Sequence, residues 1–191
     1  MMKEYIRMVV VLTVIATVCG FLLAAVRKGT ETRIEEQVLL YVQGPAVNKV
    51  LSSSTNDLIQ DRQEISVQGQ DYLIFVGERN TQPWAVAFER TAGGYGGDIG
   101  VLVGFDIERD IVTGIGILTH SETPGLGARV SESIFTDNFN NKTLNANFNV
   151  KQDGGFVDAV SGATISSRAV CSAVRKSLEL YPEIKKEIVK Q

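Results

Sequence analysis

The sequence predicts an α+β protein, with one amino-terminal transmembrane helix followed by one domain that has a mainly antiparallel sheet and flanking helices. An uncharged apolar run near the amino terminus is long enough to cross a bilayer. Strand-like segments then follow one another between residues 64 and 118 without a helical pattern between them, which favours an antiparallel over a doubly wound sheet. A long amphipathic helical pattern closes the chain.

The composition limits the classes of function. A chain of 191 residues is long enough for one membrane anchor and one domain with a sizeable core. The net charge of −3 leaves no basic footprint for nucleic acid. With two cysteines, Cys19 and Cys171, one histidine and no Cys-x-x-Cys, the sequence predicts neither a disulfide framework nor a metal site. We expect both cysteines to be small buried or lipid-facing hydrophobes.

The membrane segment is the uncharged 19-residue run from Met8 to Val26, which ends at Arg27 and Lys28. A cleaved secretory signal is the alternative, but its apolar region has at most about 15 residues and ends in a small-x-small site. Ala24-Ala25-Val26 fits such a site poorly, so we expect residues 1–28 to remain as an anchor. Positive charges are nearly balanced on the two sides of the run and do not predict its orientation.

A helical connector is predicted over residues 29–62, before the domain at 63–191. Its apolar stripe extends to about Ser53 and is interrupted at Pro45, and the polar residues 52–63 indicate a loop. Five strands are then expected, at 64–67, 72–77, 84–89, 99–107 and 111–118, with a turn at 106–110. Trp84 and Phe88 lie on one face of the third strand, where core positions are expected.

Two glycine-containing loops follow from the strand pattern. Gly93–Gly97, with four glycines in five positions, allows unusual backbone angles and close approach, although a flexible hairpin loop is the plainer interpretation. It lacks the strand-to-helix context of a dinucleotide fingerprint. The second loop, Glu122–Gly127, contains a Pro-Gly turn next to an acceptor and a donor. The nearby His120 is interpreted as structural. A helix is expected at 128–135 and little regular structure at 136–155.

The last long helix begins in the stretch Asp158–Ser167. Ser161 is the expected N-cap, and Gly162 and Ala163 leave the backbone open. Free amides and the helix dipole would stabilise an anion beside the Thr164 hydroxyl, unless that hydroxyl is simply part of the first turn. The tail from Pro182 is expected to form a short solvated helix. The apolar positions with helical period are Ile165, Ala169, Val170, Ala173, Val174, Leu178 and Tyr181.

The stretch Asp-x-x-Ser-Gly-Ala-Thr resembles the flavinylation motif of a family of membrane-anchored flavoproteins, in which FMN is joined to the last threonine by a phosphoester. Gly-Tyr-Gly-Gly (94–97), Glu-Thr-Pro-Gly-Leu-Gly (122–127) and Ser-Gly-Ala-Thr (161–164), in this order behind one membrane helix, resemble the G subunit of the Rnf complex. The related C subunit of the sodium-pumping NADH:quinone reductase shares the last two elements. It lacks the first and is usually longer, so the resemblance favours the Rnf protein.

The resemblance implies an electron-transfer subunit that is not catalytic alone, within a ferredoxin:NAD+ oxidoreductase that couples electron transfer to ion translocation. FMN would be bound covalently to Thr164. Ser161, Gly162 and Ala163 would shape the phosphate turn. The candidates for contact with the flavin ring are Glu122, Thr123, Leu126 and Gly127, and less strongly Tyr95 and Gly96 of the glycine loop.

The resemblance also implies partners and a location. The partners would be the other membrane and peripheral subunits of the complex, membrane lipid, and a separate flavin transferase that uses FAD and magnesium. The chain would cross the cytoplasmic membrane once, with its domain on the extracytoplasmic, periplasmic side. A different interpretation is an extracytoplasmic structural or binding module that carries no flavin.

Overall fold

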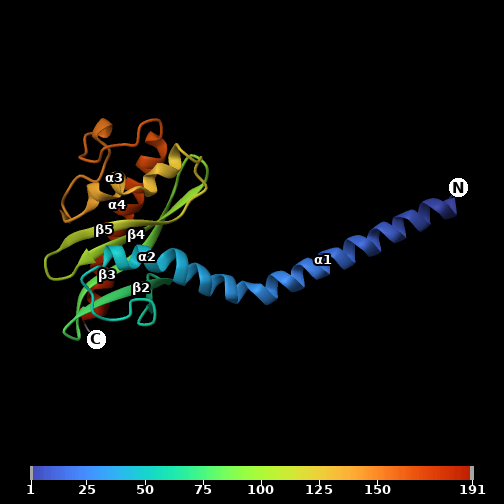
Figure 1. Cartoon of the computed structure of the whole chain (residues 1–191), viewed down its shortest axis with the longest axis horizontal. Helices are drawn as coiled ribbons and strands as arrows, with labels where there is room; N and C mark the ends of the chain where they lie inside the picture. Colours follow the sequence, from blue (N-terminus) through green and yellow to red (C-terminus); the bar gives the residue numbers. More distant parts are fainter. Residues whose placement is uncertain (1, 190–191) are drawn as a thin grey trace. The chain divides into compact units, whose positions relative to one another are not determined.

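The structure is a computed structural model that describes residues 2–189. The chain divides into two units, one ending at Tyr41 and one beginning at Val42. Helix α1 (Met2–Val38) makes up most of the first unit (Figure 1). Its segment Met2–Glu31 is long and apolar enough to cross a membrane, and its apolar side chains are exposed. The predicted membrane segment is therefore part of one continuous helix.

The helical connector is irregular before Pro45 and not at Pro45 itself, where the sequence predicts the interruption. α1 passes into a π-helical segment, η1 (Leu39–Gln43), and α2 (Gly44–Val50) follows. Pro45 lies in the first turn of α2, where its missing N–H would have no intrahelical partner in any case. It therefore starts a helix and does not break one. The polar segment after α2 has turns but neither helix nor strand between Leu51 and Arg62, as predicted.

The domain is built on one antiparallel sheet in which the strand order equals the chain order. All five predicted strands are present. The first, fourth and fifth differ from the expected bounds by one residue, whereas the second has 10 residues and the third 12, where six were expected for each. The sixth strand, which has two residues and pairs with the start of β5, was not predicted. The strands are β1 (Gln63–Val67), β2 (Gln70–Arg79), β3 (Gln82–Gly93), β4 (Asp98–Asp106), β5 (Ile111–Thr119) and β6 (Lys142–Thr143).

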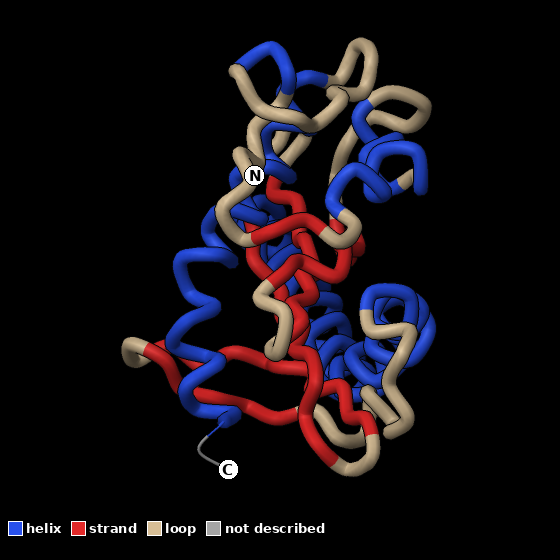
Figure 2. Tube along the Cα trace, turned by 90° about the vertical axis from the view of Figure 1, so that its left-hand side faces the viewer, coloured by secondary structure: helices blue, strands red, loops and turns tan. Residues whose placement is uncertain are grey.

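Helix α4 (Thr164–Val189) covers one face of this sheet and contacts β1, β3 and β4 (Figure 2). The main core lies between them. Phe105 stacks on Phe88 on one side and on Tyr181 of α4 on the other, with ring centroids 5.5 and 4.4 Å apart. The predicted helical period is confirmed, except that the side chain of Ile165 is 51% exposed. Cys171 is buried here as predicted, and burial raises the pKa of its thiol to about 12.

The carboxyl-terminal tail is helical as predicted, but the prediction of a short solvated helix was wrong. α4 continues through Pro182 as far as Val189, and Ile184 and Ile188 are buried in the main core. Ile184 and Ile188 come three and seven residues after the buried Tyr181. They therefore lie on the same side of the helix as Tyr181 and face the sheet. A proline inside a helix costs about 3 kcal/mol. Burying two isoleucine side chains, at about 1.5–3 kcal/mol each, offsets that cost.

Helix α2 packs on the other face, against β4 and β5. Glycines on these strands let it approach closely. A Cβ at Gly104 would clash with Val50, and one at Gly116 would lie 3.0 Å from the Cβ of Ala46. A second buried apolar layer therefore lies under α2. Its members are Val47, Val50, Leu51, Leu58, Phe75, Ala85, Ala87, Leu102 and Leu118.

Short helices and loops between β5 and α4 gather at one end of the sheet (Figure 1, yellow to orange). The helix expected at 128–135 is divided into η2 (Gly127–Ser131) and α3 (Ser133–Thr136). The segments η3 (Asp137–Phe139) and η4 (Lys151–Asp153) follow. Little of 136–155 is regular, as predicted, but Phe139 and Phe148 are fully buried and hold the segment in place.

Candidate functional site

The three motifs of the sequence meet around one cleft of about 440 Å³. The glycine loop between β3 and β4 forms one wall, the loop after β5 a second and the start of α4 a third. The residues that line the cleft are Tyr95, Glu122, Thr123, Leu126, Gly127, Gly162, Ala163, Thr164, Ile165 and Ser166.

Glu122 connects the three walls. Its side chain is 5% exposed. Oε1 accepts hydrogen bonds from the backbone N–H groups of Tyr95 and Gly96, at 2.8 and 3.0 Å. Oε2 accepts one from the hydroxyl of Ser166 on α4, at 2.6 Å. One carboxylate thus holds the glycine loop and the first turn of α4 against the loop that carries it.

The Glu122 carboxyl is held in its ionised form. Burial alone would raise its pKa, but the hydrogen bonds from Ser166 and from the two backbone N–H groups outweigh burial, so the pKa of Glu122 is lowered. The charge of nearby His120 acts in the same direction. The three hydrogen bonds compensate the carboxylate for its loss of water, so the charge can be buried here.

Glycine is required where the loops approach Glu122. A Cβ at Gly94 or at Gly127 would clash with the Glu122 carboxylate, and one at Gly96 would clash with the backbone of Ser121. The glycine loop is itself closed by a hydrogen bond of 2.8 Å from the Gly94 N–H to the Gly97 carbonyl. The loop is therefore a fixed turn around the carboxylate and not a flexible hairpin.

The loop after β5 touches the start of α4 through Leu126. The Thr123 carbonyl accepts the N–H groups of Leu126 and Ala128, each at 3.2 Å. The Leu126 side chain then lies near Gly162, about 3.8 Å from where a Cβ would be. Gly162 has a φ of 77°, in the left-handed region, which glycine adopts without strain.

The hydroxyl groups at the start of α4 have different environments. Ser167 donates to the Ala163 carbonyl and accepts from the Val160 N–H, each at 3.0 Å, and Ser166 is bound to Glu122. Thr164 lines the cleft, and its hydroxyl has no partner within residues 2–189. Because α4 begins at Thr164, the predicted N-cap at Ser161 is wrong. Ser161 lies in the turn before the cap position, and is exposed.

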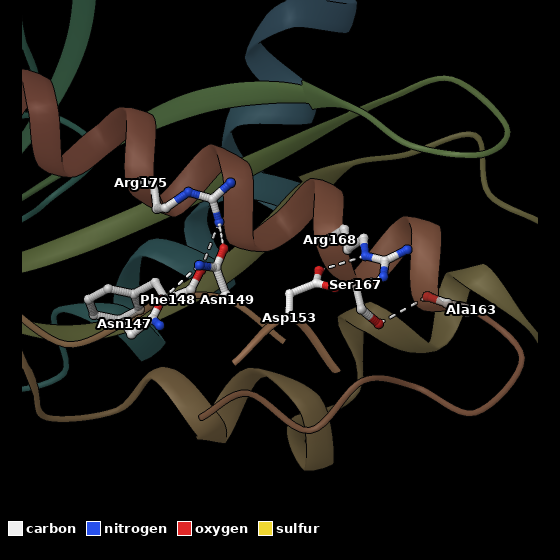
Figure 3. A network of polar contacts seen from close by, with 8 residues as sticks. All are labelled: Asn147, Phe148, Asn149, Asp153, Ala163, Ser167, Arg168 and Arg175. Carbon is white, nitrogen blue, oxygen red and sulfur yellow. Dashed lines mark hydrogen bonds and ion pairs between the residues drawn. The ribbon is translucent and has the colours of Figure 1, made fainter. Parts of the chain in front are cut away.

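Ion pairs and hydrogen bonds fasten α4 to the preceding segment (Figure 3). Arg168 makes a bidentate contact with Asp153, at 2.7 and 2.8 Å. Further along the helix, Arg175 donates to the Phe148 carbonyl at 2.9 Å and to the Asn149 side chain. These contacts hold residues 148–153 along α4.

Exposed apolar side chains surround the cleft opening. Tyr95 is 74% exposed, and Leu126 and Ile165 are each 51% exposed. The first N–H groups of a 26-residue helix have no intrahelical partners, and the first three residues of α4, Thr164, Ile165 and Ser166, all line the cleft. Apolar walls suit a planar aromatic group, while a helix start suits an anionic group such as phosphate.

The structure thus brings together most of the predicted site residues. Gly96 and Ser161 do not line the cleft: Gly96 supports Glu122, and Ser161 lines a neighbouring hollow. Two lining residues were not predicted, namely Ile165, which the helical period assigned to the core, and Ser166, whose role depends on a partner 44 residues away. Residues 2–189 contain no group of His, Cys, Asp and Glu side chains suited to hold a metal.

Comparison with known proteins gives three findings. The family model described as FMN-binding domain matches residues 94–179, which include all three motifs. The G subunit of the ion-translocating oxidoreductase complex of Pseudoalteromonas atlantica is 33% identical, over 94% of this chain and 88% of that protein. The corresponding protein of Shewanella piezotolerans is 29% identical, over 99% and 95%. The crystal structure of NqrC from Shewanella oneidensis has the same fold, with 18% identity, a TM-score of 0.53 and 73% of each chain covered.

Proposed function

Since this chain belongs to the family of G subunits of ion-translocating oxidoreductase complexes and carries an FMN-binding domain, we propose that it relays electrons through an FMN bound covalently to Thr164. FMN, when bound, supplies a group that takes up and passes on electrons. The task of the chain is to hold that group in place, to shield it and to set its electrostatic environment.

The cleft fits FMN by the chemistry of its walls. Its volume of about 440 Å³ lies within the range of small-molecule sites, about 300–1,000 Å³. Tyr95, Leu126 and Ile165 offer apolar surface for the ring system. The start of α4 offers N–H groups and the positive end of the helix dipole to a phosphoester on Thr164.

The state of the neighbouring hydroxyl groups is the observation that carries the proposal. Ser166 and Ser167 are buried and committed to internal hydrogen bonds, and Ser161 lies outside the cleft. Thr164 combines a hydroxyl that has no partner in the described chain with a place at the helix start. Thr123 also lines the cleft but lies in a loop, so it is the appropriate control.

The same proposal includes partners and orientation. The chain would work with the other subunits of an Rnf-type ferredoxin:NAD+ oxidoreductase and would receive FMN from a separate flavin transferase. The flavin-bearing domain would face the extracytoplasmic side. A covalent bond would suit that location, because a dissociated cofactor would be lost there by diffusion.

The test is to locate the flavin on the denatured chain. Trypsin should release residues 152–168, which carry Ser161, Thr164, Ser166 and Ser167 together, so the FMN mass must be placed by fragmenting this peptide. We expect it on Thr164. Thr164→Val keeps the shape of the side chain and removes the hydroxyl, so the chain should fold and lose its visible absorption. Ser161→Ala and Thr123→Val should retain it.

Two results would contradict the proposal. An FMN mass on another residue would move the attachment site. A wild-type chain that is coexpressed with a flavin transferase and shows no visible absorption after acid precipitation would favour a module without covalent flavin.

A further inference from the structure

A second cleft, of about 330 Å³, lies beside α2, and we propose that it binds a phosphate group. It shares no lining residue with the first cleft. Its walls come from α2 and the segment after it, the end of β2, the start of β3, the end of β4 with the turn that follows it, the first half of β5, and the segment before β6. Its polar lining residues are Lys49, Ser52, Ser53, Arg79, Asp106, Arg109, Thr113, Asn140 and Asn141.

Positive charge is concentrated in this cleft, although the chain as a whole has a net charge of −3. Lys49, Arg79 and Arg109 come from three different elements and line one hollow. Asp106 is the acidic side chain in the lining, and its Oδ1 already accepts the backbone N–H groups of Glu108 and Arg109, at 3.0 and 2.9 Å. Like charges so placed repel one another, and a bound anion would relieve that repulsion.

The ion pairs of Lys49 and Arg109 are weak. The Lys49 ammonium is 3.9 Å from Asp137, and the Arg109 Nε is 4.0 Å from Asp106. Both separations exceed hydrogen-bond distance. Both basic side chains are more than half exposed, so water screens these pairs. The Lys49 ammonium also donates a hydrogen bond of 3.3 Å to the exposed Ser133 hydroxyl, and on binding it would exchange that contact for the anion.

Arg79 is placed with donors to spare. Its Nε–H donates to the Ser53 carbonyl at 3.2 Å, and its guanidinium lies 3.6 Å from the centre of the Trp84 ring. Stacking fixes the plane of the guanidinium, and its terminal N–H groups have no partner within residues 2–189. The Thr113 hydroxyl in the lining is also buried without a partner in the described chain.

These features indicate a phosphate group more than a carboxylate. A carboxylate presents two oxygens in one plane, whereas a phosphate presents three or more around a centre, and the three cations approach from three elements. The planar fork of arginine also matches phosphate oxygens in pairs. The volume, near the lower limit for small-molecule sites, admits a phosphate with a small substituent. Such a phosphate could belong to a free anion or to a lipid headgroup.

Trp84 provides the signal for a test, because it is the one tryptophan of the chain and lines the cleft. Full-length protein in neutral detergent is titrated with inorganic phosphate, and the emission of Trp84 is followed. Binding should move the Arg79 guanidinium relative to the Trp84 ring. The Trp84 emission should therefore change with phosphate concentration until the site is saturated. Sodium chloride at matched ionic strength is the control for screening.

Charge-removing variants test the site itself. Lys49→Gln and Arg109→Gln should each raise the apparent Kd by about 10-fold, as expected for loss of a hydrogen bond to a charged group. Lys176→Gln, on the exposed side of α4, is the matched control and should leave the Kd unchanged. Arg79 is not varied, because its contact with Trp84 would alter the signal directly.

A second titration distinguishes the sources of the phosphate. The detergent micelles receive increasing fractions of short-chain phosphatidic acid, and equal fractions of short-chain phosphatidylcholine, which has no net charge, are the control. Saturation by inorganic phosphate supports a free anion, and a response to phosphatidic acid alone supports a lipid headgroup. The proposal is overturned if neither probe changes the emission, if sodium chloride reproduces the change, or if Lys49→Gln and Arg109→Gln bind like the wild type.

Discussion

At the scale of single residues, Glu122 shows how one side chain organises a site. Its place in a motif predicts contact with the flavin ring. The structure directs both carboxylate oxygens inward, to the glycine loop and to Ser166. Sequence could locate the residue but not its partners, since these lie 26, 27 and 44 positions away.

Glu122 should make the stability of the domain sensitive to acid. A carboxyl whose pKa is lowered on folding stabilises the fold above its unfolded pKa, about 4.3, and loses that contribution as the pH falls through the folded value. At pH 7, Glu122→Gln should therefore lower the free energy of unfolding by about 1–3 kcal/mol. The difference from wild type should shrink towards pH 3. Urea denaturation of the full chain in detergent at several pH values measures it.

Glu132→Gln is the control for this experiment, because Glu132 is exposed and pairs with Arg129 at the surface. It should change stability little at any pH. A gap between wild type and Glu122→Gln that stays constant from pH 7 to pH 3 would show that the charge of Glu122 is not what stabilises the loops.

At the scale of elements, the long strands and α4 were predicted because their periods are local properties of the sequence. β6 and the separate η2 and α3 were not predicted, because their existence depends on contacts with β5 and with buried phenylalanines. The tail from Pro182 was predicted to be solvated because of its charged side chains, whereas Ile184 and Ile188 are buried and attach it to the core. Tertiary burial decided this case against local propensity.

The tail should therefore contribute to stability. Ile184→Ala removes a fully buried side chain and should lower the free energy of unfolding by about 2–5 kcal/mol. Lys186→Ala, two residues away and exposed, should remain within about 0.5 kcal/mol of the wild type. Equilibrium denaturation followed by Trp84 emission compares them. Equal stability of both variants would mean that the helix beyond Pro182 does not support the core.

At the scale of the whole molecule, the chain joins an apolar helix to a domain that matches the FMN-binding domain family. The sequence could identify the helix, because composition alone makes it long and apolar enough to span a membrane. It could not supply the orientation, because the flanking charges are balanced. The orientation rests on the resemblance to the family.

We therefore predict that the mature chain retains residues 1–27 and that its domain faces the extracytoplasmic side. Protease added to intact spheroplasts should remove the domain, and mass spectrometry of the untreated chain should find the amino terminus uncleaved. A cytoplasmic marker protein should stay intact in the same sample. Digestion of the domain only after lysis would reverse the orientation.

The strand order determines when the candidate site can form. Each strand pairs with its predecessor, so the sheet can grow hairpin by hairpin as the chain emerges. Helix α4 comes last and must close over β1, β3 and β4, from the far end of the sequence. Two walls of the candidate cleft belong to the early loops and the third to this final helix. Thr164 therefore reaches its position only when the domain is complete, and attachment of FMN would mark chains that have been fully made and correctly folded.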